Sequence, residues 1–210
     1  MVTKEHILQW LEQFATAIAQ HKEYLTQLDA AIGDADHGIN MDRGFQKVAS
    51  QLPALAAQDI SSILKSVSMT LISSVGGASG PLYGTFFLRA STAVVAGKQE
   101  LSDEDMVKLL QAGLDGVLQR GKAQLGDKTM IDALSPAVAT FTQIISEGKT
   151  TSQAIQQATT AAEQGMQATI PMVAKKGRAS YLGDRSINHQ DPGATSVYLM
   201  IQSLSNVLVE

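Results

Sequence analysis

A chain of 210 residues is long enough for one sizeable core, and we expect residues 1–210 to form a single domain. The formal net charge of −4 disfavours non-specific nucleic-acid binding, and the absence of cysteine excludes disulfides and thiolate metal sites. Neither an uncharged apolar run of membrane-spanning length nor a signal-peptide core occurs, so a cytoplasmic location without a membrane partner is expected.

Apolar residues recur at helical spacing along nearly the whole chain, which predicts a succession of amphipathic helices. Three helix starts carry capping signals: Asp59, Ser102 ahead of an acidic turn, and Asp191 ahead of a proline. Pro53 should stop the second helix, and Pro171 should distort the last turn of the seventh. The expected helices span 3–29, 40–51, 59–71, 79–96, 102–121, 131–145, 151–173 and 191–208.

No segment is a convincing strand, and the short connections predict that neighbouring helices run antiparallel. The pattern therefore predicts an all-α fold, either a bundle or a closed ring of about eight helices. The exception is the irregular segment 175–190. A loop of that length within a compact domain is usually functional or disordered.

The strongest functional signal is the segment Gly33-Asp34-Ala35-Asp36-His37-Gly38-Ile39-Asn40, which follows shortly after a third carboxylate, Asp29. Carboxylate oxygens are preferred ligands of Mg²⁺, and two divalent cations bridged by a polyphosphate would offset the repulsion between three aspartates. Gly33 and Gly38 would let the backbone fold tightly around an ion. The alternative is an ordinary polar turn between two helices.

An EF-hand calcium loop is excluded at this place. The position that requires glycine in such a loop holds Ile39, and the position that requires glutamate holds Phe45.

A second signal is the glycine-rich stretch Gly76-Gly77-Ala78-Ser79-Gly80, which precedes Pro81 and opens a helix. Helix N-termini present unpaired N–H groups that suit phosphate, although close helix packing is an alternative reason for glycines there. The patterns of a P-loop and of a Rossmann turn are both absent. Together with the acidic loop, the stretch favours a phosphate site.

Three further polar residues allow two interpretations each. Lys128 and Arg178 could neutralise phosphate or be solvated surface charges, and Arg178 is the better candidate because it lies in the long loop. His37 could contact phosphate or be a structural hydrogen-bonding group.

Taken together, these segments resemble the nucleotide-binding L subunits of dihydroxyacetone kinases, in family order and over nearly the whole chain. The resemblance implies a closed antiparallel barrel of eight amphipathic helices with the nucleotide at one end. The segments that carry it are Asp29 with 33–38, then 76–81, 126–130, and 177–183 with 191–193.

The same resemblance implies the ligand set. Asp29, Asp34 and Asp36 would coordinate two Mg²⁺, and no residue of this chain would act as a catalytic group. The residues expected to contact ADP or ATP are His37, Gly38, Ile39, Asn40, Ala78, Ser79, Gly121, Met130, Arg178, Asp191, Pro192 and Gly193.

Two forms of the family exist, one fused into a long chain that uses free ATP and one built of separate subunits that uses phosphoenolpyruvate. This chain resembles the L part alone, which favours the second form. Its bound ADP would then be rephosphorylated by a multiphosphoryl M subunit, and the phosphoryl group would pass to dihydroxyacetone on a K subunit, giving dihydroxyacetone phosphate. The chain would be a phosphotransferase subunit that is active only with these partners. A transcription regulator and a homodimer remain open as further partners, and nucleic acid is not expected.

Three other functions stay open. A two-metal phosphohydrolase would release phosphate from nucleotide by itself, and a nucleotide domain of another kinase would serve a different substrate-binding partner. A regulatory module would instead present its nucleotide-bound state to a partner such as a transcription factor.

Overall fold

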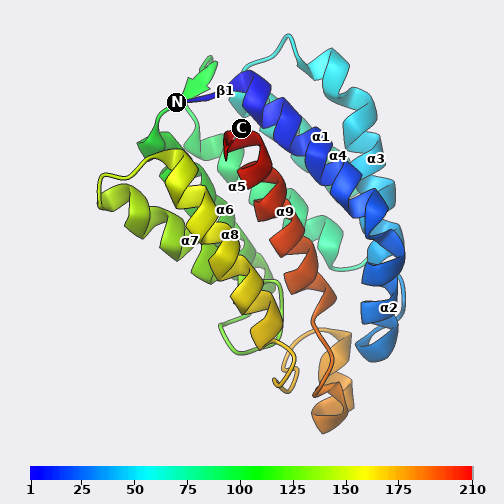
Figure 1. Ribbon diagram of the computed structural model, residues 1–210. Helices are drawn as coiled ribbons and strands as arrows, with labels where there is room; N and C mark the ends of the chain where they lie inside the picture. Colours follow the sequence, from blue (N-terminus) through cyan, green and yellow to red (C-terminus); the bar gives the residue numbers. More distant parts are fainter. Residues whose placement is uncertain (210) are drawn as a thin grey trace.

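The computed structural model describes residues 1–209, and α-helices dominate that part of the chain (Figure 1). Its two strands, β1 (Val2–Thr3) and β2 (Glu100–Leu101), form one short antiparallel pair. The helices are α1 (Lys4–Gln20), α2 (Lys22–Ile32), α3 (His37–Leu55), α4 (Ile60–Ser74), α5 (Ser79–Ala93), α6 (Asp103–Gly121), α7 (Ile131–Ser146), α8 (Thr151–Ala168), the 3-10 helix η1 (Arg178–Ser186) and α9 (Pro192–Val209).

Helices from α3 to α9 pack each against the next along the chain, and α9 also packs against α1, which in turn contacts α3. This cyclic order of contacts surrounds a single apolar core, in which Trp10, Tyr83 and the phenylalanines are almost fully buried. Trp10 illustrates how the core joins the two ends of the chain, because its indole N–H donates to the carbonyl of Met200 at 2.9 Å. The predicted all-α class is confirmed, whereas the closed barrel remains a prediction.

Several predicted boundaries were wrong, and each has a local cause. The helix predicted over 3–29 is divided at His21, whose φ of −101° and ψ of 9° interrupt the helical path between α1 and α2. The second helix starts at His37 because the carboxylate of Asp29 accepts its first N–H groups. Pro53 does not stop this helix but lies in its last turn, two residues before its end at Leu55.

At the other end of the chain, α8 stops at Ala168 rather than continuing to residue 173, and Thr169 begins a turn. The segment 175–190 is ordered by η1 instead of being an irregular loop. The two strands were missed because pairs of two residues are too short to show an alternating pattern.

The predicted helix caps are confirmed. Asp59 accepts from the backbone N–H of Ser62 at 2.9 Å, and Asp191 accepts from that of Ala194 at 2.7 Å. Ser102 forms a full capping box with Asp105 at the start of α6.

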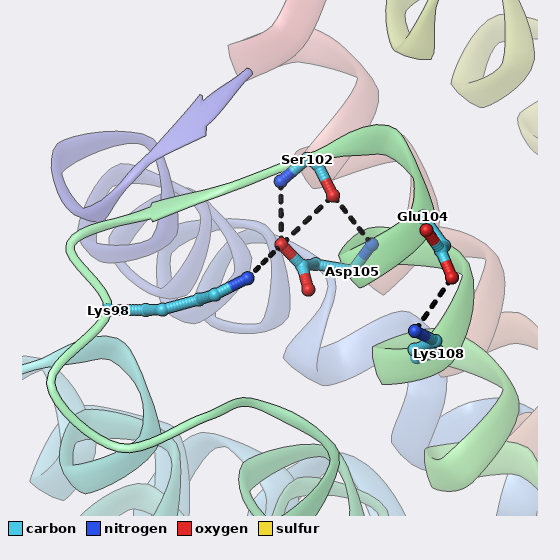
Figure 2. A network of polar contacts seen from close by, with 5 residues as sticks. All are labelled: Lys98, Ser102, Glu104, Asp105 and Lys108. Carbon is cyan, nitrogen blue, oxygen red and sulfur yellow. Dashed lines mark hydrogen bonds and ion pairs between the residues drawn. The ribbon is translucent and has the colours of Figure 1, made fainter.

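Figure 2 shows this start of α6 from close by. The carboxylate of Asp105 accepts from the backbone and hydroxyl of Ser102 and from the ammonium of Lys98 at 2.5 Å, which lowers the pKa of Asp105 to about 2. Next to Asp105, Glu104 forms an exposed ion pair at 2.7 Å with Lys108, one turn further along α6. The network fixes the connection from β2 into α6.

The two ends of the chain lie at one end of the molecule, and α2 and η1 lie at the other (Figure 1). The segments that carry the predicted site residues meet at this second end. Within residues 1–209, no helix combines the length and the apolar character that crossing a membrane would need.

Candidate functional site

Three carboxylates converge where α2 passes into α3. Asp29, Asp34 and Asp36 each offer one oxygen, and these oxygens all lie within 4.8 Å of one another. Asp29 is buried in the last turn of α2, and its Oδ2 accepts from the backbone N–H groups of Asp36 at 2.8 Å and of His37 at 3.1 Å. Asp29 therefore anchors the loop and caps α3 at the same time.

The loop between these carboxylates depends on one glycine and one strained residue. A Cβ at Gly33 would lie 2.0 Å from Oδ1 of Asp29, so only glycine leaves room for this carboxylate to fold back over the loop. Ala35 adopts a positive φ of 62°, which reverses the chain between the two other aspartates. The backbone thus turns three negative groups toward one point.

Oxygen donors of this kind fit a hard divalent cation such as Mg²⁺. The cluster contains no nitrogen or sulfur ligand. Among residues 1–209, the only salt bridge to these three aspartates joins Oδ2 of Asp34 to Nε of Arg178 at 2.9 Å. Positive charge from bound cations would relieve the remaining repulsion between the carboxylates.

His37 lies behind the cluster and is tied to two other elements. Its Nδ1 lies 3.0 Å from the hydroxyl of Ser79, and its Nε2 lies 3.0 Å from the hydroxyl of Ser196. Ser196 accepts from the phenol of Tyr83 and donates its own proton to the carbonyl of Gly193. Nε2 must therefore carry the proton of the imidazole, and Ser79 donates to Nδ1.

The surroundings of His37 also determine its protonation state. Burial lowers the pKa of His37 to about 4, although the charges of Asp29 and Asp36 oppose that shift. The imidazole is neutral near pH 7, and both of its nitrogens are engaged within the protein. Its side chain joins α3 to α5 and α9, and this is the structural hydrogen-bonding arrangement considered from the sequence.

The glycine-rich turn faces the acidic loop at the start of α5. Gly77 has a φ of 63°, and a Cβ there would meet nothing closer than Nδ2 of Asn40 at 4.0 Å. Gly80 has a different role, since a Cβ there would lie 2.2 Å from the carbonyl oxygen of Val75. Open space therefore lies over Gly77, where a phosphate group can approach, while Gly80 permits close packing.

A cavity of about 410 Å³ joins these parts. It extends from the three aspartates and the glycine-rich turn to an apolar wall formed by Leu82, Val117, Ala123, Met130 and Ile131. Of the residues predicted as ligands, the cavity is lined by Asp29, Asp34, Asp36, His37, Ala78, Ser79, Gly121, Met130, Arg178, Asp191, Pro192 and Gly193.

Three predicted nucleotide contacts do not line the cavity. A Cβ at Gly38 would lie 2.0 Å from the carbonyl oxygen of Lys22, so this glycine permits α3 to pack on α2. Asn40 is buried, and its Oδ1 accepts from Arg43 at 2.6 Å. Ile39 is 46% exposed on the surface beside the loop.

Sequence reasoning missed several residues of the site. Leu82 and Val117 carry only the general apolar pattern of their helices, and Arg120 and Lys176 resemble surface charges in sequence. Lys128 was expected to neutralise phosphate or to be solvated, but it is 1% exposed and its ammonium is bonded to backbone carbonyls. No signal in the local sequence distinguishes a buried lysine from an exposed one.

Asp191 is the other unusual ionisable group of the cavity. Burial raises its pKa to about 7, while the hydrogen bond from Ala194 and the charge of Lys128 act in the opposite direction. A carboxyl group at the N-terminus of α9 is thus poised between its neutral and charged forms.

Known proteins are similar to this chain over nearly its whole length. The model of the DAK2 domain matches residues 31–206. The chain is 52% identical over 204 residues to the ADP-binding subunit DhaL of the PEP-dependent dihydroxyacetone kinase of Escherichia coli K12, covering 97% of each chain. It is 41% identical to the corresponding subunit of the PTS-dependent enzyme of Lactococcus lactis, covering 99% of this chain and 100% of that subunit.

A solved structure shows the same fold. The chain superposes on the dihydroxyacetone kinase of C. freundii in complex with AMP-PNP and Mg²⁺ with a TM-score of 0.72 and 26% sequence identity. The match covers 95% of this chain and 33% of that one, so the similarity extends over about a third of that longer enzyme.

Proposed function

Because this chain belongs to the DAK2 domain family, we propose that it is the ADP-binding phosphotransfer subunit of a phosphoenolpyruvate-dependent dihydroxyacetone kinase. The observation that carries the proposal is the placement of three converging carboxylates opposite a glycine-rich helix start in one cavity. One wall of the cavity thus provides ligands for metal ions, and the facing wall provides backbone N–H groups that can donate hydrogen bonds to phosphate.

Each wall has a part in holding the nucleotide. Asp29, Asp34 and Asp36 would hold two Mg²⁺, which supply positive charge to the phosphates. The backbone of the 76–79 turn and the N-terminus of α5 face the same phosphates, and the apolar wall around Met130 and Leu82 suits the base. Two divalent cations bring four positive charges against three aspartates, so Arg178 and the helix N-terminus are needed to balance the phosphates.

Phosphoryl transfer requires little covalent chemistry from the protein. Catalysis by this chain consists of positioning the phosphates in line and of neutralising charge as the bond to the leaving oxygen breaks. ADP held in this cavity would supply the phosphate oxygen that accepts a phosphoryl group from a phosphoenolpyruvate-fed multiphosphoryl subunit. The ATP so formed would give its γ-phosphoryl group to a hydroxyl of dihydroxyacetone on the K subunit, with ADP as the leaving group and dihydroxyacetone phosphate as the product.

The metal part of the proposal is tested by Asp36→Asn, which removes one ligand charge from the cluster. We expect Mg²⁺-dependent ADP binding, measured by calorimetry, to be lost or strongly weakened. The matched control is Asp115→Asn on the exposed face of α6, which should bind ADP as the unaltered protein does. Full ADP affinity in Asp36→Asn would exclude the three-aspartate site.

Whether the nucleotide is a resident coenzyme requires a second experiment. The chain is mixed with a K subunit and excess free ATP, without a multiphosphoryl subunit. We expect about one turnover per bound ATP, and continuous turnover only after the phosphoenolpyruvate-fed subunit is added. Sustained turnover with free ATP alone would show that nucleotide exchanges freely, and release of phosphate by the isolated chain would favour a phosphohydrolase instead.

A further inference from the structure

Lys128 occupies an unusual place in the connection between α6 and α7. It adopts a left-handed φ of 61°, although it is not glycine, and its side chain is almost fully buried. The surrounding turn is held by Asp132, whose carboxylate accepts from the backbone N–H groups of Gly126 at 2.5 Å and of Thr129 at 2.7 Å. A strained residue persists only where its neighbours fix it in this way.

The ammonium of Lys128 donates all of its hydrogen bonds to backbone carbonyls. It donates to the oxygens of Thr169 at 2.8 Å, of Met172 at 3.1 Å and of His189, and the oxygen of Ile170 lies at 3.4 Å. An ammonium has three protons and no acceptor, so these contacts use its whole donor capacity. Lys128 lines the cavity, but it has no proton left for a phosphate.

These carbonyls come from both ends of one chain segment. We call residues 173–187 the lid loop. The two segments that flank it, 169–172 and 188–191, are joined to each other, and we call them the neck. The neck is closed by hydrogen bonds from the N–H of Asn188 to the carbonyl of Ile170 at 2.8 Å and from the N–H of Asp191 to the hydroxyl of Thr169 at 3.0 Å. Lys128 bonds to both sides of this neck.

The lid loop reaches from its neck to the acidic loop on the opposite wall. Its residues 176–179 line the cavity, and Arg178 contacts Asp34 at 2.9 Å. The loop is also tied internally, because the hydroxyl of Ser186 accepts from the N–H of Ala174 at 2.9 Å. The position of Arg178 over the cavity therefore depends on how firmly the neck is held.

We propose that Lys128 is a positioning residue that fixes the neck of the lid loop and thereby sets how slowly nucleotide leaves the cavity. This inference rests on the proposed nucleotide site. The charge of the ammonium suits the place, since the carbonyls beyond the last turn of α8 lie at the negative end of the helix. Neither methionine nor arginine would reproduce the contacts: methionine removes the donor to the carbonyls of Met172 and His189, and a planar guanidinium cannot converge on all of these oxygens.

The test measures dissociation of ADP from the full chain in Mg²⁺. Lys128→Met should release ADP roughly tenfold faster or more, because at least one buried carbonyl loses its partner. Lys128→Arg should not restore slow release. The matched control is Lys175→Met, which removes an exposed charge from the same lid loop and should leave the rate within about twofold of the unaltered protein.

A double-variant cycle separates positioning from general stability. If Lys128 acts through the lid loop, Lys128→Met should have little further effect on ADP release once Arg178→Ala is present. Lower thermal stability with an unchanged release rate would overturn the inference, and so would additive effects of the two changes. Failure of the unaltered protein to bind ADP would instead refute the proposed nucleotide site.

A measurement on the unaltered protein keeps the inference testable if Lys128→Met does not fold. Hydrogen exchange should show the neck amides of Asn188 and Asp191 already protected in the absence of ADP and Mg²⁺. Amides of the lid loop should gain protection only when ADP is bound. Protection of the neck that appears only with ADP would overturn the role of Lys128 as a permanent fastening.

Discussion

Acidification should reveal the buried histidine of the site as a measurable loss of stability. The folded pKa of His37, about 4, lies below the ordinary value of 6.5, so protonation favours the unfolded chain. The stabilising contribution is complete above pH 6.5 and is lost as the pH falls toward 4. At about 1.4 kcal/mol for each unit of pKa, the shift is worth up to about 3 kcal/mol.

Asp191 should act in the opposite direction over the same range. Its folded pKa of about 7 lies above the ordinary value of 3.8, so its neutral form favours the folded chain. This contribution is complete below pH 3.8 and is lost as the pH rises toward 7. The unaltered protein therefore shows only the difference between the two effects, and variants are needed to separate them.

The assay is urea unfolding in EDTA between about pH 7 and about pH 4, with His37→Gln and Asp191→Asn beside the unaltered protein. Glutamine can keep the contacts to Ser79 and Ser196 but does not titrate. As the pH falls, the stability advantage of the unaltered protein over His37→Gln should shrink, and its advantage over Asp191→Asn should grow. Parallel curves for His37→Gln and the unaltered protein would refute a buried neutral imidazole.

Two substitutions should separate stability from nucleotide binding. Gly77→Val and Gly148→Val both place a side chain at positive φ in open space, so each should lower stability by about 1 kcal/mol or more, while only Gly77→Val should abolish ADP binding in titrations. Retained ADP affinity in folded Gly77→Val would mean that the turn is purely structural. Asp105→Asn breaks the capping network of α6 and should cost about 1–2 kcal/mol in thermal melts without changing ADP affinity, because Val117, the first residue of α6 that lines the cavity, lies roughly 18 Å further along the helix. Weakened ADP binding in Asp105→Asn would contradict this separation.

The sequence predicted those parts of the molecule whose cause is local. The caps at Asp59 and Ser102 follow from one residue and the three after it, and the acidic loop lies within eight consecutive residues after Asp29. Boundaries were less predictable, since they depend on contacts made elsewhere. Helix α3 starts early because Asp29, eight residues before His37, supplies an acceptor for its N-terminus.

The roles of residues whose partners lie far away in the chain could not be predicted from the sequence. Lys128 bonds to carbonyls more than forty positions away, and nothing around it in sequence indicates that it is buried. The same holds for Ser196, which meets His37 across 159 positions. The glycines of the acidic loop were recognised from the sequence, but the motif suggests the same role for each of them. The structure distinguishes Gly33, which accommodates Asp29, from Gly38, which accommodates the backbone of α2.

The arrangement of the cavity predicts a large effect of ligand removal on thermal stability. Its walls come from segments that are far apart in the chain, from Asp29 in α2 to Gly193 in α9, so a bound nucleotide would join them. A ligand that binds only the folded state at about 100 times its Kd stabilises by about 2.7 kcal/mol. For a domain of this size, that corresponds to a fall in Tm of roughly 5–10 °C when ADP and Mg²⁺ are stripped. Scanning calorimetry at several ADP concentrations measures it, and Asp36→Asn, which should not respond to ADP, is the control. A Tm that is independent of ADP in the unaltered protein would contradict a ligand that joins these walls.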